Sequence, residues 1–297
     1  MITEVGILTS DLARSVAFWE ACLGTPASRH PDTESVPGDI AIVLTEQNVT
    51  ATDSTVLPSA GAIGRVRLIE TDTENSRARS SERRPQGWRA VEVMVRDLDR
   101  TFANASELAS DVLGLPRWLG GKPEVGIRAG QLLSPGGEVV YLTELDRSVV
   151  KLELPDEREF GSVFIMVLGT HDIDGSVEYY AASGYALLNR STQRITSLNL
   201  LQGTPDHETQ SALVSAGSGT YFEVNEYAAG DQRERPTSAA LGPIAYVRMT
   251  ELPASAGERE GATGSTTTLH RRMGPNSEVF LIDGGTPQDN YATSRSQ

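Results

Sequence analysis

The sequence predicts an α+β fold built from repeated strand–helix–strands modules. Three segments share one helix start: SDLARSVAFWEACLG from Ser10, RDLDRTFANASELASDVLG from Arg96 and HDIDGSVEYYAASGY from His171. Each follows an apolar, strand-like run and opens with an Asp, which accepts hydrogen bonds from the free N–H groups of a helix's first turn. Apolar residues then recur at helical spacing, giving each helix one buried stripe. Each copy is therefore one unit that packs on another.

Two further segments predict the end of a module. SPGGEVVYLTEL (Ser134–Leu145) and GPNSEVFLIDGG (Gly274–Gly285) both place Glu-Val and an alternating run after a Pro/Gly turn, which is typical of a hairpin's second strand. We therefore expect four modules, at about 1–72, 88–147, 160–228 and 242–285. The first two would form one domain (1–147) and the last two another (160–285), with a linker at 148–159 and a tail at 286–297.

The fourth module differs from the other three. It keeps a strand, PIAYVRM, and the closing hairpin. Its helix segment reads ELPASAGEREGATG, and Pro together with three Gly disfavours a regular helix. The sequence predicts a degenerate helix there.

Composition excludes several classes of partner. The 297 residues suit two cores, and a net charge of −14 argues against nucleic acid and against an anionic membrane surface. No apolar run approaches the roughly 20 residues that span a bilayer, and no basic-then-apolar leader opens the chain. One cysteine, Cys22, excludes an intrachain disulfide. We expect a cytoplasmic protein with a small-molecule ligand, and a homodimer is compatible with the sequence.

The modules resemble those of the vicinal oxygen chelate superfamily, which includes glyoxalase I, methylmalonyl-CoA epimerase, extradiol dioxygenases and bleomycin-resistance proteins. The resemblance lies in VGILTSDLARSVAFWEACLG, similar to the superfamily's opening strand and helix, and in PGGEVVYLTEL, similar to its closing hairpin. It implies βαβββ modules that pair into two half-open, glyoxalase-like barrels. In relatives, a divalent metal in the barrel chelates two neighbouring substrate oxygens.

The resemblance also implies where metal ligands would lie: seven residues before the capping Asp, and on each module's last strand. The first domain would offer Glu4, Arg67, Ala90 and Tyr141, and the second Ile165, Glu223, Tyr246 and Leu281. Divalent metals need several histidine or carboxylate ligands, and an arginine repels the ion. We expect no metal or other cofactor, with a divalent metal kept as the alternative.

The residues that replace the ligands suggest a site for proton transfer. Glu4 or Glu92 would act as the base, Arg67 would hold an oxyanion, and Tyr141 would orient the substrate. The competing interpretation is a buried Glu4–Arg67 ion pair that fills a dead site. In the second domain, Glu223 has aromatic neighbours, and we expect a substrate-binding group there made of Glu223, Tyr221, Tyr246 and His270.

Two functions from different classes follow. The first is a metal-independent isomerase, epimerase or lyase that acts beside a carbonyl of a small, partly apolar metabolite. The second is a non-catalytic binding protein of the resistance or sequestration type. A metal-dependent dioxygenase or lyase ranks third, because the two histidines and the glutamate of an iron site are not found at the ligand positions. Substrate identity and reaction direction stay open.

Overall fold

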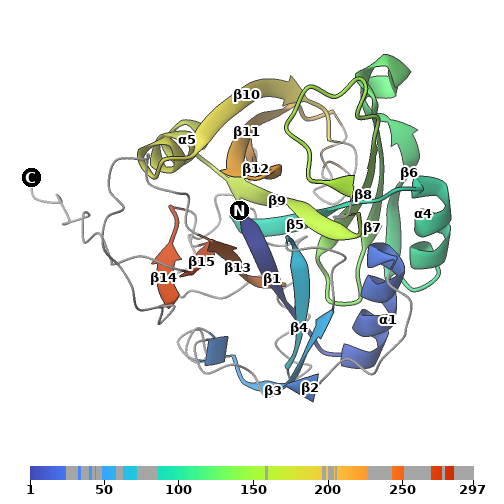
Figure 1. Cartoon of the computed structure of the whole chain (residues 1–297), viewed down its shortest axis with the longest axis vertical. Helices are drawn as coiled ribbons and strands as arrows, with labels where there is room; N and C mark the ends of the chain where they lie inside the picture. Colours follow the sequence, from blue (N-terminus) through green and yellow to red (C-terminus); the bar gives the residue numbers. More distant parts are fainter. Residues whose placement is uncertain are drawn as a thin grey trace, which may run out of the picture.

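The protein is described by a computed structural model over residues 1–24, 33–34, 40–41, 44, 49–57, 63–71, 86–157, 160–195, 199, 204, 206–226, 243–250, 269–275 and 278–283. Within these residues the chain forms two mixed β-sheets with helices beside them (Figure 1). None of the described helices has the length and apolar character needed to cross a bilayer.

The predicted modules are confirmed in chain order. The first contains β1 (Ile2–Thr9), α1 (Leu12–Leu23), β2 (Thr33–Glu34), β3 (Ala51–Leu57) and β4 (Arg65–Thr71). The second contains β5 (Gly87–Met94), α4 (Leu98–Ser106), β6 (Asp111–Trp118), the short 3₁₀ turns η2 (Leu119–Gly121) and η3 (Pro123–Val125), β7 (Ile127–Leu133) and β8 (Val139–Leu145).

The third module contains β9 (Ser162–Thr170), α5 (Ile173–Ala182), β10 (Ala186–Gln193), β11 (Thr209–Gly217) and β12 (Thr220–Glu226). The fourth contributes β13 (Ile244–Thr250), β14 (Leu269–Met273) and β15 (Val279–Asp283). The predicted degenerate helix and the predicted tail lie outside the described residues. The α+β class with tandem modules is confirmed.

All three shared helix starts are capped as predicted. The Oδ1 atoms of Asp11, Asp97 and Asp172 accept from the backbone N–H three residues on, at 3.0, 3.0 and 2.8 Å. Each helix is also tied to its own module's last strand, because a glutamate there accepts from the first helical N–H: Glu70, Glu144 and Glu226, at 3.5, 2.9 and 3.4 Å. The repeated sequence therefore encodes a repeated junction.

The modules pair differently from our expectation. One sheet, here sheet A, has the order β14-β15-β13-β1-β4-β3-β2, and the other, sheet B, has the order β10-β11-β12-β9-β5-β8-β7-β6. Antiparallel pairing of β1 with β13 joins modules one and four, and pairing of β5 with β9 joins modules two and three. The expected pairing of module one with two, and of three with four, in common sheets is therefore wrong. That residues 148–159 link two domains stays a prediction. Each sheet contains strands from before and after this segment.

The two sheets bury one shared core. Alternate residues of both sheets enter it, among them Val5 and Ile7 of β1 and Val91 and Val93 of β5. Trp88 of β5 crosses between the sheets and donates to the carbonyl of Val279 on β15 at 3.3 Å. Because side chains alternate along a strand, each sheet has an opposite face turned away from this core, here called its far face. The candidate residues lie on the far faces.

Candidate functional site

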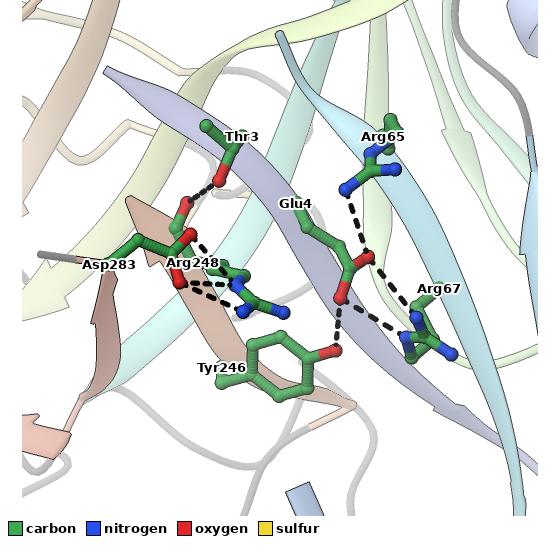
Figure 2. Close-up of polar contacts among 7 residues, drawn as sticks. All are labelled: Thr3, Glu4, Arg65, Arg67, Tyr246, Arg248 and Asp283. Carbon is green, nitrogen blue, oxygen red and sulfur yellow. Dashed lines mark hydrogen bonds and ion pairs between the residues drawn. The ribbon is translucent and has the colours of Figure 1, made fainter. Parts of the chain in front are cut away.

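The far face of sheet A carries a cluster centred on Glu4. Val66 and Leu68 of β4 enter the shared core, so Arg67 between them turns to the far face. The Glu4 carboxylate accepts from Arg67 Nε at 3.1 Å and Nη2 at 3.5 Å, and from the Tyr246 hydroxyl at 2.7 Å (Figure 2). Arg65 Nη2 lies 3.8 Å from the same carboxylate. Glu4 and Arg67 are 1% and 6% exposed, so this is a buried ion pair.

The surroundings of Tyr246 are filled rather than open. Its ring lies over Gly6, where an added Cβ would come within 2.1 Å of the tyrosine Cε1. A separate apolar cluster packs around it and includes Leu8, Ile40, Leu44, Val49, Ile69, Val279 and Leu281. Burial and the charge of Glu4 raise the pKa of Tyr246 well above its ordinary value, so it remains a neutral donor. The cluster suits a structural role.

A second charged pair on this face, between Arg248 and Asp283, is also well formed. Arg248 of β13 forms a bidentate pair with Asp283 of β15, with distances of 2.8 to 3.0 Å (Figure 2). The Thr3 hydroxyl donates to the Arg248 carbonyl at 3.2 Å. These contacts tie modules one and four together along β13.

The far face of sheet B carries two glutamates that form no ion pair with any described residue. Val91 and Val93 of β5 enter the shared core, as do Phe222 and Val224 of β12, so Glu92 and Glu223 turn to the far face. They stand on opposite sides of β9, where Glu92 pairs in register with Ile165 and Glu223 with Val167. Within the described part of the chain, no salt bridge joins either carboxylate to Arg, Lys or His.

The two carboxylates influence each other's protonation. Burial, and then repulsion by Glu223, raises the pKa of Glu92 to about 8, against a smaller lowering by the hydrogen bond from Thr143. Burial raises the pKa of Glu223, opposed by the hydrogen bond from Asn225. A pKa of about 8 keeps Glu92 protonated near neutral pH, and two coupled carboxyls of unequal pKa are the condition for an acid and a base in one site. We call these two residues the glutamate pair.

Apolar residues flank the glutamate pair on both sides. One small cluster contains Ala90, Leu113, Val139 and Val167, with Leu133 and Tyr141 against it. The other contains Met94, Phe164, Ile165 and Tyr221, with Leu145, Leu152, Phe160 and Leu213 against it. Glu92 and Glu223 are partly accessible between these clusters, unlike Glu4. A partly apolar molecule suits such surroundings.

The structure regroups the predicted site residues. It brings Glu4 and Arg67 to Tyr246 on sheet A, whereas Glu92 and Tyr141 face each other across β5 and β8 on sheet B, near Glu223. The prediction that Glu4, Arg67, Glu92 and Tyr141 line one cavity is therefore wrong, because it depended on sheet pairing between modules one and two. Their catalytic roles stay predictions.

The predicted substrate-binding group is also divided. Glu223 and Tyr221 lie on β12 in sheet B, and the Tyr221 hydroxyl donates to the carbonyl of Glu153. Tyr246 belongs to the Glu4 cluster of sheet A. His270 lies on β14, where its backbone pairs with Ile282, and its side chain lies outside the described residues.

Sequence reasoning missed the residues that hold the glutamate pair in place. The Thr143 hydroxyl donates to Glu92 Oε1 at 2.6 Å, and Asn225 Nδ2 donates to Glu223 Oε1 at 2.8 Å. Each donor lies on a strand face that alternation already marks: Thr143 two residues after Tyr141, and Asn225 two after Glu223. The alternation rule could have found them.

The described residues do not fit the divalent metal of relatives. No group of three or more His, Cys, Asp or Glu gathers among them. At Glu4 both carboxylate oxygens face arginines, whose permanent charge opposes a cation. The glutamate pair offers two carboxylates where such sites use three or four nitrogen, oxygen or sulfur ligands.

Comparisons with known proteins agree with this architecture. No protein-family model matches the chain, and no curated protein matches it. Among solved structures, glyoxalase I from Zea mays aligns over 95% of this chain and 91% of its own, with a TM-score of 0.58 and 12% identity. A proposed dioxygenase from Bacillus subtilis aligns over 95% and 84%, with a TM-score of 0.55 and 9% identity. At such identity the likeness establishes the fold alone. The chain therefore has the tandem glyoxalase fold that its resemblance to the vicinal oxygen chelate superfamily predicts.

Proposed function

We propose that the protein is a metal-independent isomerase, epimerase or lyase that transfers a proton beside a carbonyl of a small, partly apolar molecule. The observation that carries the proposal is the glutamate pair on sheet B, two partly accessible carboxylates without a cationic partner among the described residues. Glu4 and Arg67 have a structural role in this proposal. A homodimer and a cytoplasmic location, expected from the sequence, stay predictions.

The chemistry needs one carboxylate and one carboxylic acid. The ionised glutamate removes the proton from the carbon beside the carbonyl, and the C–H electron pair moves toward the carbonyl oxygen to give an enolate. The neutral glutamate returns a proton to the same carbon in an epimerase, or to a neighbouring atom in an isomerase. In a lyase, the enolate expels a group from the adjacent carbon, and the neutral glutamate protonates it. Exchange with water then resets the pair.

The enolate oxygen needs a hydrogen-bond donor. Tyr141 suits this role, because its backbone pairs in register with Glu92 and its side chain lies on the same face. A neutral donor in a water-poor site stabilises developing negative charge without a cation. Tyr141 thus takes the place that the sequence interpretation gave to Arg67.

The proposal is tested by hydrogen exchange. The purified protein, dialysed against a chelator and checked by elemental analysis, is incubated in D₂O with a panel of small apolar ketones and thioesters. Mass spectrometry then measures deuterium at the carbon beside the carbonyl. We expect exchange that Glu92→Gln and Glu223→Gln each lower by roughly a hundredfold or more, since general acid–base groups contribute about 10²–10⁴.

Two results would contradict the proposal. Exchange that requires about one metal ion per chain would favour metal-dependent chemistry. Saturable binding of a panel compound without exchange would favour the binding protein of the same fold. Glu226→Gln is a matched control, because Glu226 also lies on β12 but turns to the start of α5.

A further inference from the structure

A row of polar side chains crosses three strands of sheet B and ends at Glu223. Gln193 Nε2 of β10 donates to Ser211 Oγ of β11 at 3.2 Å. Ser211 Oγ donates to Asn225 Oδ1 of β12 at 2.5 Å, and Asn225 Nδ2 donates to Glu223 Oε1 at 2.8 Å. Ser211 and Asn225 are 4% and 1% exposed, so water does not compete with the middle of the row. We call Gln193, Ser211 and Asn225 the donor row.

All donors in the donor row point the same way, toward Glu223. A chain of hydrogen bonds with one direction polarises its members, and its last donor stabilises negative charge at the acceptor. Glu92 accepts from a single donor instead of a chain of donors. The Thr143 hydroxyl donates to it at 2.6 Å, and no described side chain donates to Thr143. The two carboxylates therefore have unequal surroundings although they face the same region.

We propose that Ser211 and Asn225 are positioning residues that keep Glu223 ionised as the base, so that the single proton of the glutamate pair resides on Glu92. The role of Glu223 as the catalytic base depends on the proposed function. The location of the proton on Glu92 does not, and it can be measured without a substrate. It gives the reaction a direction at the site: proton removal toward β12 and proton delivery from β5.

The neighbouring groups are consistent with this order of ionisation. Burial and the charge of Glu223 raise the pKa of Glu92 to about 8, whereas the hydrogen bond from Asn225 opposes the effect of burial on the pKa of Glu223. Tyr141 of β8 and Tyr221 of β12 also occupy this face, and burial raises the pKa of Tyr221 to about 12, so it stays neutral. The nearest cations among the described residues lie at the edge of this face: Arg147 donates to the sulfur of Met94 at 3.9 Å, and Arg147 and Arg96 lie 5.7 and 4.7 Å from the ring centroid of Phe160.

The test is a titration of the full chain without substrate. Glutamate labelled with ¹³C at Cδ reports each carboxyl by NMR between pH 4 and 10, and Glu92→Gln and Glu223→Gln assign the two signals. We expect Glu223 to titrate before Glu92. We expect Ser211→Ala to raise the Glu223 midpoint by roughly 0.5–1 pH unit, the equivalent of one hydrogen bond. Gln193→Met, at the accessible end of the donor row, is the second variant in case Ser211→Ala does not fold. It should raise the Glu223 midpoint as well, but by less.

The control is Ser191→Ala, since Ser191 is exposed on β10 directly opposite Ser211 and should leave both midpoints unchanged. The inference is overturned if Glu92 titrates first, or if Ser211→Ala and Gln193→Met leave the Glu223 midpoint in place. A downward shift would mean that the Asn225 amide is reversed and that Glu223 holds the proton. Failure of deuterium exchange with the panel would count against the proposed function and leave these midpoints as they are.

Discussion

Glu4 and Glu92 occupy first strands of their modules, yet their surroundings give them opposite properties. Glu4 is enclosed by Arg67, Arg65 and Tyr246, so its charge is balanced and its oxygens are engaged. Burial and repulsion by a second carboxylate favour the protonated form of Glu92, against the smaller opposing effect of the hydrogen bond from Thr143. Glutamates at comparable places in two modules thus differ in charge state because their neighbouring side chains differ.

Replacing Arg67 tests the structural role of the Glu4 cluster. Arg67→Ala leaves the buried Glu4 carboxylate with Tyr246 and the more exposed Arg65, and we expect a loss of roughly 3–5 kcal/mol in the free energy of unfolding. Urea denaturation measures it. Glu4→Gln combined with Arg67→Met should recover part of the loss, because no charge is then left buried without its partner. A full loss of deuterium exchange at unchanged stability would return Arg67 to the catalytic site.

The residues of the site were predictable in kind but not in grouping. Alternation places Glu92, Tyr141 and Glu223 on one side of their strands, which the sequence alone reveals. Which strand lies beside which between modules depends on contacts far apart in the chain, such as Ile244 with Ile7. No local pattern encodes those contacts, so the sequence analysis groups Glu4 and Arg67 with Glu92 and Tyr141, which lie in the other sheet.

At the scale of elements, the Glu-Val hairpins link modules as well as closing them. Glu138, after the β7–β8 turn, accepts from Trp19 Nε1 of α1 at 3.0 Å, and Glu278 accepts from the Tyr180 hydroxyl of α5 at 2.6 Å. Trp19 and Tyr180 stand eight residues after their capping Asp (19 − 11 and 180 − 172). The second and fourth modules therefore hold the helices of the first and third in equivalent ways.

The Glu138 link makes stability depend on pH. Burial raises the pKa of Glu138 from its ordinary 4.5 to about 7, and its Oε2 has no hydrogen-bond partner among the described residues. The folded protein thus retains a proton that the unfolded chain releases. Stability from this group is complete below about pH 4.5 and is lost as the pH rises to about 7, by roughly 3 kcal/mol.

Glu138→Gln tests this pH dependence. The amide can still accept from Trp19 but does not titrate, so the fall in unfolding free energy between pH 5 and pH 7.5 should be smaller in the variant. Urea denaturation at several pH values measures the slope. Glu178→Gln, an exposed position on α5, should retain the wild-type slope. An unchanged slope in Glu138→Gln would show that the group does not titrate in this range.

At the scale of the whole molecule, the two halves of the chain share both sheets. Modules one and four build sheet A, and modules two and three build sheet B, so neither 1–147 nor 160–285 contains a complete sheet. We expect the segment 1–150 expressed alone to be poorly folded, and the two segments expressed together to associate and unfold in a single transition. Size-exclusion chromatography and circular dichroism measure this. Two independently folded fragments would instead support the sequential domains that the sequence predicts.

The architecture was largely predictable because it repeats. The Asp helix starts and the Glu-Val hairpins recur with their own local signals, and both are present in the structure. The strand order was not predictable. Pairing modules one with two and three with four satisfies the same alternation and capping rules as pairing one with four and two with three. The difference lies in β1–β13 and β5–β9, two antiparallel contacts between modules.

The interleaved order has a consequence for synthesis on the ribosome. Sheet B uses one continuous stretch, from Gly87 to Glu226, and can close while the chain is still growing. Strand β1 is made before the other strands of sheet A, but it gains its neighbour β13 only after Ile244–Thr250 has emerged. One edge of β1 therefore stays unpaired while the segment between them is translated, and such edges promote aggregation. Chaperone demand during translation should concentrate on the opening module rather than on the middle of the protein.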